Sequence, residues 1–128
     1  PLSLEQLEHM HNLKTGALIA AAAATPALLA GSRPDLFARL QRFGQRVGLA
    51  FQIHDDILDV TGTSATTGKS TQKDAALDKP TFPSVIGLEA SRAHAVRQRD
   101  LALAEIRQFP GNCDCLEWLA GYAIARDS

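Results

Sequence analysis

The stretch that decides the fold is PDLFARLQRFGQRVGLAFQIHDDILDVT, residues 34–61. Its large apolar residues fall on one broad arc when successive residues are turned by about 100°, the angle of an α-helix. They are Leu36, Leu40, Phe43, Val47, Phe51, Ile57 and Leu58. Pro34 suits the first helical position and Asp35 the first turn. The pattern ends near Thr61-Gly62 and predicts one long amphipathic helix.

Three further helices are expected, over about residues 3–26, 81–108 and 114–126. Ser3 and Gln6 form a capping box at the start of the first, and Pro26 kinks or ends it. The apolar positions of these helices are Leu4, Leu7, Met10 and Leu18; Leu88, Val96, Leu103 and Ile106; and Leu116, Leu119 and Ala123 beside the aromatic pair Trp118 and Tyr122. No segment alternates as a strand would, so we predict an all-α helical bundle, one region over residues 1–128.

Composition narrows the classes of partner. The 128 residues are 45% apolar and 21% charged, with a formal net charge of −1, so no nucleic-acid partner is expected. The longest apolar stretch, Ala17 to Ala30, is broken at Thr25-Pro26 and is shorter than the ~20 residues of a membrane span. No secretory leader is visible, and a mutual disulfide is not expected between Cys113 and Cys115, which are separated by one residue. A cytoplasmic location is therefore expected.

The sequence His-Asp-Asp-Ile-Leu-Asp, residues 54–59, places three carboxylates on one helix. Asp55, Asp56 and Asp59 repel one another by about 0.2–0.5 kcal/mol per pair, near a helix end that already disfavours anions. A divalent cation removes both penalties, and Mg²⁺ prefers such oxygen ligands. The alternative interpretation is an ordinary solvated acidic face. Gly44 and Gly48, on the same side of the helix, leave a trough for close helix packing or for a ligand.

Basic residues flank this acidic motif in the sequence. His11 and Lys14 fall within the apolar arc of the first helix, and Lys14 either extends its ammonium to water or points into a cleft that awaits an anion. Thr15 beside it offers a hydroxyl. Lys69, Lys73 and Lys79 follow the motif in a polar stretch that is either a solvated loop or a source of cations for a diphosphate. Gly62 and Gly68 enclose one residue too many for a phosphate-binding P-loop.

These residues together resemble the trans-prenyltransferases of the polyprenyl synthetase family, and among them bacterial farnesyl diphosphate synthases. The resemblance rests on HNLKTGALI (11–19), GLAFQIHDDILDV (48–60), GK (68–69), KPTFPS (79–84) and GLE (87–89), which occur in order and cover nearly the whole chain. It implies the C-terminal part of the isoprenoid synthase fold, with the N-terminal half and its first Asp-rich motif outside this chain. Gln72 departs from the glycine usual there, which makes Lys73 a weaker candidate.

The resemblance also implies a reaction, in which isopentenyl diphosphate condenses with an allylic diphosphate (dimethylallyl or geranyl) to give farnesyl diphosphate. Asp55, Asp56 and Asp59 match the second Asp-rich motif, which binds Mg²⁺. The residues that match contacts to the allylic diphosphate are Lys14, Thr15, Gln52, Lys69 and Lys79, and Lys14, Asp55 and Lys69 are the candidate catalytic residues. Family resemblance further implies a homodimer, and this chain alone is expected to be inactive.

Two other classes of function stay open on the sequence alone. One is a non-catalytic helical partner or pseudoenzyme that pairs with a separate half. The other is a helical interaction module with an incidental acidic face. Within the enzyme interpretation, a longer-chain synthase such as a geranylgeranyl diphosphate synthase, or a terpene cyclase, competes with a farnesyl diphosphate synthase, and these residues do not set the product length.

Overall fold

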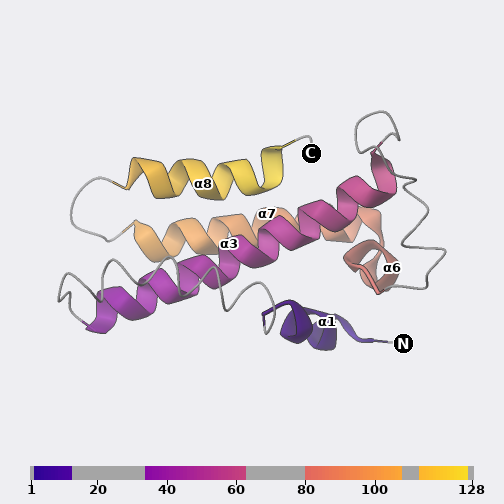
Figure 1. The fold of residues 1–128 in the computed structure, drawn as a ribbon, viewed down its shortest axis with the longest axis horizontal. Helices are drawn as coiled ribbons and strands as arrows, with labels where there is room; N and C mark the ends of the chain where they lie inside the picture. The colour runs from indigo at the N-terminus through magenta and orange to yellow at the C-terminus, as the bar shows by residue number, and fades with distance from the viewer. Residues whose placement is uncertain (1, 13–33, 63–79, 108–112, 127–128) are drawn as a thin grey trace.

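The computed structural model describes residues 2–12, 34–62, 80–107 and 113–126, and these residues form helices with no β-strand among them. The helices are α1 (Leu4–His11), α3 (Pro34–Thr61), α6 (Phe82–Ile86), α7 (Leu88–Ile106) and α8 (Asp114–Ala125). Figure 1 shows α7 lying along α3, α8 beside them, and α1 and the short α6 near one another. The all-α prediction is confirmed.

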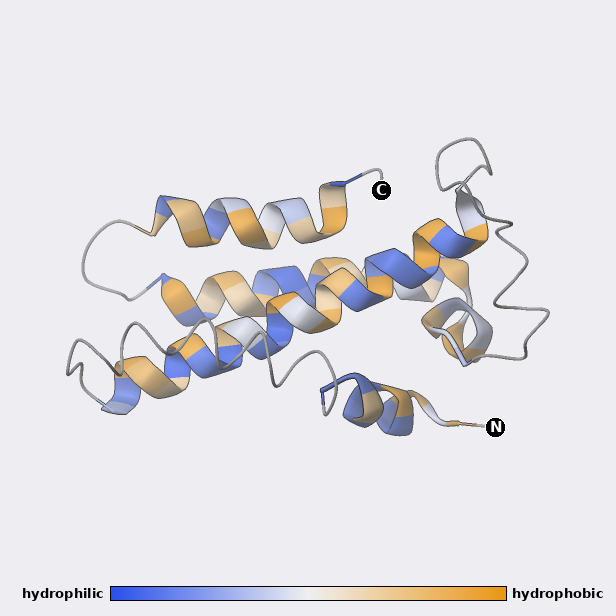
Figure 2. Cartoon of the chain, in the orientation of Figure 1, coloured by the Kyte–Doolittle hydropathy of each residue, from blue (hydrophilic) through white to orange (hydrophobic). Residues whose placement is uncertain are grey.

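The long helix α3 contributes to two large apolar clusters along its length, and to a smaller one around Leu40. Toward its start, Phe43 and Val47 pack with the end of α7 and with α8, through Ala102, Ile106, Ala120 and Ala123. Toward its end, Leu49, Ile53 and Ile57 pack with Leu7 of α1, Phe82 of α6 and Ala95 of α7. Figure 2 shows the apolar positions interleaved with polar ones along each helix. Helix α3 therefore links the two ends of the molecule, and its acidic motif lies at the second cluster.

The predicted helix over 81–108 is in fact two helices separated by Gly87. Thr81 is the N-cap of α6 and forms a reciprocal capping box with Ser84. Gly87 then has φ 88° and ψ 161°, a conformation that residues with a side chain rarely adopt. Its N–H donates to the Pro83 carbonyl while its own carbonyl accepts from the Ser91 N–H, so it both ends α6 and begins α7. The prediction of one continuous helix was wrong at this residue.

Other boundaries agree with the sequence where the structure describes them. The Ser3–Gln6 capping box is present at the start of α1, and α8 spans Asp114–Ala125 as expected. The rest of the predicted first helix, from residue 13 onward, lies outside the described residues. None of the helices among the described residues is both long enough and apolar enough to cross a membrane.

Several predicted core residues are exposed instead. The exposed fractions of Phe51, Val96 and Leu119 are 38%, 41% and 40%, so their assignment to buried apolar faces was wrong. The buried positions of α7 are Ser91, Ala95, Gln98, Ala102 and Ile106. Most of these side chains are small or polar, which lets α7 lie close to α3 and hides its buried face from a hydrophobicity pattern.

Candidate metal and diphosphate site

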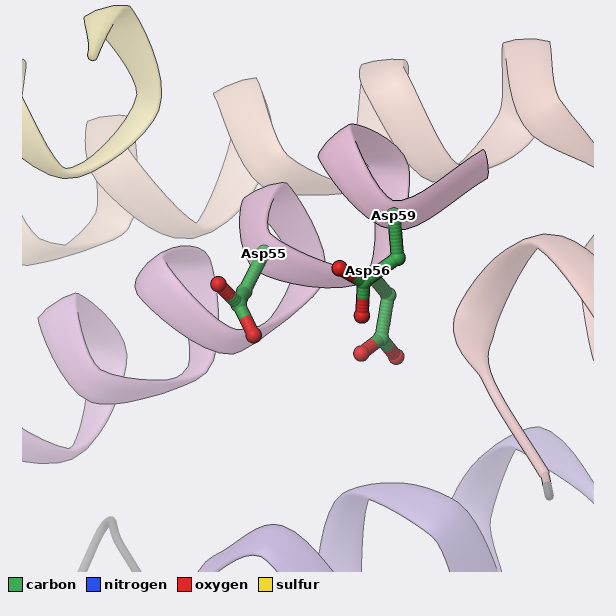
Figure 3. A group of neighbouring side chains, drawn as sticks. All are labelled: Asp55, Asp56 and Asp59. Atoms are coloured by element: carbon green, nitrogen blue, oxygen red, sulfur yellow. The ribbon is translucent and has the colours of Figure 1, made fainter. Parts of the chain in front are cut away.

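The carboxylates of Asp55, Asp56 and Asp59 come together near the end of α3, as the sequence predicts. One oxygen from each lies within 4.8 Å of the others, and Asp55 and Asp59 are half-buried while Asp56 is buried. Figure 3 shows the three side chains on the last turns of α3, with Asp55 one turn before Asp59. Three hard oxygen donors gathered in this way could hold a divalent cation. Mg²⁺ takes one or two carboxylates in such sites and completes its shell with water or phosphate oxygens.

Asp56 also has a structural task. Its carboxylate is 5% exposed, and both oxygens accept hydrogen bonds. Gln52 Nε2 donates to Oδ1 at 3.0 Å, and the backbone N–H of Phe82 donates to Oδ2 at 3.0 Å. Gln52, which the sequence indicates as a candidate contact for substrate, therefore lies beside the acidic motif and is hydrogen-bonded to it. Asp56 links the acidic turn of α3 to the start of α6.

Phe82 is the residue through which this link reaches other helices. Its fully buried ring stacks on the His11 ring, with 5.5 Å between centroids, and meets the His94 ring at 6.2 Å. His94 Nε2 in turn pairs with the carboxylate of Glu8. The first turn of α6 is therefore fixed against α1, α3 and α7 at once.

Asp55 faces a basic group that sequence reasoning did not single out. Arg126, directly after α8, places Nη2 3.7 Å from Asp55 Oδ1 and donates from Nη2 to the carbonyl of Phe51 at 3.0 Å. Its Cζ lies 3.8 Å from the centroid of the Phe51 ring, a cation–π contact. His54 Nε2 donates to the backbone carbonyl of Arg126 at 2.7 Å. The end of α8 is thereby attached to the acidic turn of α3.

The sequence signal for Arg126 was weak: a single basic residue at the end of the last predicted helix. Since 72 residues separate His54 from Arg126, no helical spacing relates them. Gly44 and Gly48 are both buried in α3, which agrees with close helix packing. The other predicted site residues, Lys14, Thr15, Lys69 and Lys79, and also Lys73, lie outside the described residues.

The described helices with this carboxylate triad define the class of an α-helical protein that has a candidate site for a divalent cation. Residues 1–109 match the polyprenyl synthetase family. The chain belongs to that family, and the predicted family and the isoprenoid synthase type of fold are confirmed.

Individual relatives agree with this assignment. The chain is 41% identical to the farnesyl diphosphate synthase of Escherichia coli strain K12 over 128 residues, and 36% identical to the chloroplastic geranylgeranyl pyrophosphate synthase of Catharanthus roseus, also over 128. These alignments cover 97% and 99% of this chain but 43% and 36% of the relatives, so the chain spans less than half of their length.

A solved structure gives the same result for the fold. The geranyltransferase of Helicobacter pylori, complexed with magnesium and isoprenyl diphosphate, is 34% identical, with a TM-score of 0.75. The match covers 97% of this chain and 41% of that one.

Proposed function

We propose that this chain is the C-terminal part of a Mg²⁺-dependent prenyltransferase that condenses an allylic diphosphate with isopentenyl diphosphate. The observation that carries the proposal is the triad of Asp55, Asp56 and Asp59, whose ligand oxygens lie within 4.8 Å of one another in a member of the polyprenyl synthetase family. Three converging carboxylates repel one another unless a cation sits between them.

The roles of the residues follow from charge. Asp55, Asp56 and Asp59 would hold Mg²⁺, which would supply positive charge to the diphosphate of the allylic substrate and so assist its departure. Lys14, Lys69 and Lys79 supply further positive charge to the same diphosphate, and Thr15 and Gln52 supply hydrogen bonds. Lys14, Asp55 and Lys69 are the proposed catalytic residues among them.

We propose that the other groups needed for the reaction lie in the part of the relatives that this chain does not span. There we place the first Asp-rich motif and the groups that hold isopentenyl diphosphate. The 128-residue chain is accordingly proposed to bind Mg²⁺ and an allylic diphosphate but not to turn over. We further propose a homodimer in the cytoplasm and farnesyl diphosphate as the product. Geranylgeranyl diphosphate is the alternative product, because synthases of both products are among the relatives.

The test is calorimetric titration of Mg²⁺ together with a non-reactive allylic diphosphate analogue into the chain, beside Asp55→Ala. Asp100→Ala is the matched control, since Asp100 is an exposed carboxylate of α7. We expect metal-dependent binding that Asp55→Ala abolishes and Asp100→Ala leaves unchanged. Binding that is the same in all three chains, or absent from a folded chain, contradicts the proposal.

Activity is tested by joining the chain to the N-terminal part of a relative and analysing the products. We expect prenyl diphosphate only from the joined protein, with farnesyl as the chain length. The competing interaction module predicts a different result. In that case Asp55→Ala changes neither ligand binding nor folding, because the acidic face is merely solvated.

A further inference from the structure

The end of α8 encloses a positive charge that the proposed reaction does not use. The side chain of Arg126 is 5% exposed, and its Nε is buried without a hydrogen-bond partner. A guanidinium cannot lose its proton to escape this environment, so it needs a negative partner. Among the described residues, the carboxylate within 4 Å of it is that of Asp55.

The geometry of the pair is that of a charge held near a carboxylate rather than of a closed, two-point ion pair. Nη2 and Oδ1 are 3.7 Å apart, beyond hydrogen-bond distance, while Nη2 is committed to the Phe51 carbonyl at 3.0 Å. The Phe51 ring below the guanidinium and the bond from His54 to the Arg126 carbonyl fix the residue further. Arg126 is therefore held in place by α3, and Asp55, whose side chain is 47% exposed, is the partner able to turn toward another cation.

We propose that Arg126 is a positioning residue that partly neutralises Asp55, so that the site disfavours bare Mg²⁺ and favours Mg²⁺ that arrives with a diphosphate. The inference rests on the proposed function, which makes Asp55 a metal ligand. A fixed cation beside a ligand oxygen repels an incoming divalent ion by Coulomb's law. A diphosphate carries several negative charges and reverses the sign of that interaction, so metal and diphosphate bind together.

The sign of the effect separates this role from a merely structural one. Loss of a structural support loosens Asp55 and weakens Mg²⁺ binding, whereas loss of a repelling charge strengthens it. Arg126→Met removes the charge and keeps much of the volume over Phe51. We expect it to bind Mg²⁺ about 3- to 10-fold more tightly than the unaltered chain at low ionic strength, and less so at high salt. Arg126→Lys keeps the charge and should stay within about twofold.

The experiment is titration of the 128-residue chain with Mg²⁺ alone and with Mg²⁺ plus inorganic diphosphate, with folding checked by circular dichroism. Arg126→Gln, which keeps a donor for the Phe51 carbonyl, replaces Arg126→Met if the latter does not fold. The gain in affinity for bare Mg²⁺ is expected to vanish or to reverse with diphosphate present. Equal or weaker binding of bare Mg²⁺ by the neutral variants overturns the inference.

A second readout follows the ion pair directly. In ¹H–¹⁵N spectra the buried Nε–H of Arg126, identified by its absence in Arg126→Lys, should shift when Asp55→Asn is introduced without metal, and also when Mg²⁺ is added to the unaltered chain. No shift in Asp55→Asn overturns the inference by itself. If Asp55→Asn still binds Mg²⁺, the proposed function is contradicted instead. If Asp55→Asn loses Mg²⁺ binding but Arg126→Met does not bind Mg²⁺ more tightly, only the role of Arg126 is contradicted.

Discussion

Asp56 shows how one carboxylate of a repeated motif differs from its neighbours through what surrounds it. Asp55 and Asp59 are half-buried, whereas Asp56 is 5% exposed with hydrogen bonds at both oxygens. A buried carboxylate is stable only when donors replace the water that it has lost. Gln52 and the Phe82 N–H are those donors, so Asp56 contributes to folding whether or not a metal is bound.

The first prediction concerns Asp56→Asn. The amide cannot accept at two positions as the carboxylate does, and it places an N–H against one of the two donors. We expect the free energy of unfolding to fall by about 1–3 kcal/mol, because a buried donor left without its acceptor costs that much. Urea denaturation followed by circular dichroism measures it, and the backbone N–H of Phe82 should exchange with solvent faster.

The matched control for this prediction is Asp100→Asn, which removes a carboxylate from an exposed position. The side chain of Asp100 is 59% exposed and pairs with Arg99, the preceding residue. Exposed pairs of this kind contribute between nothing and about 1 kcal/mol, so this variant should remain close to the unaltered chain. Equal stability of the two variants would show that Asp56 is not an anchor.

At this scale the sequence predicts the acidic triad but not its surroundings. Asp55, Asp56 and Asp59 lie within one turn or so of one helix, where spacing alone determines which side chains are neighbours. The contacts of Asp56 with Phe82 and of Asp55 with Arg126 join distant parts of the chain, and only the packing of α6 and α8 on α3 creates them. Phe51 was assigned to the core because it is a large apolar residue on the apolar arc of its helix. Its ring is instead partly exposed and lies against the guanidinium of Arg126, a contact that a hydrophobicity pattern does not show.

At the scale of the elements, Gly87 decides where one helix ends and the next begins. A glycine inside a helical pattern costs only about 1 kcal/mol, so the sequence alone did not predict a break there. Its conformation, φ 88° and ψ 161°, lies in a region open almost exclusively to glycine. The helix interiors were predictable from periodicity, and this boundary was not, because a single backbone angle determines it.

The second prediction is therefore made for Gly87→Ala. Apart from the adjacent residues, no atom lies within 4 Å of an added Cβ, so a clash with the rest of the structure does not contribute and the cost is backbone strain. We expect a loss of about 1–3 kcal/mol in the free energy of unfolding, measured by urea denaturation. Because α6 carries Phe82 against Asp56, the loss should be accompanied by faster amide exchange at the start of α6.

Gly121→Ala is the matched control and should have the opposite sign. Gly121 lies within α8, and an added Cβ there meets no atom within 4 Å apart from its chain neighbours and the backbone of its own helix. Alanine in a helix interior is favoured over glycine by about 0.5–1 kcal/mol, so this variant should be more stable than the unaltered chain. Destabilisation by both substitutions would indicate that strain at Gly87 is not the cause.

For the whole molecule, the apolar clusters share α3, but they leave one face of α8 uncovered by the described residues. The exposed fractions of Trp118, Leu119 and Tyr122 are 64%, 40% and 45%. The rings of Trp118 and Tyr122 stack with 5.0 Å between their centroids. The sequence predicted these residues in a helix but not their exposure, since exposure depends on which elements cover a face. Contiguous apolar surface of this kind favours association.

The third prediction is that the 128-residue chain self-associates through this face. Light scattering should give a molar mass that rises with protein concentration. Over the same concentrations the fluorescence emission of Trp118, the single tryptophan, should shift to shorter wavelength. Leu119→Lys should reduce both effects, because burial of an ammonium in an apolar contact is costly. Val96→Lys is the matched control, because Val96 is an apolar residue with a similar exposed fraction, 41%, on another helix, α7. A mass independent of concentration, or equal reduction by both lysines, would show that α8 does not mediate association.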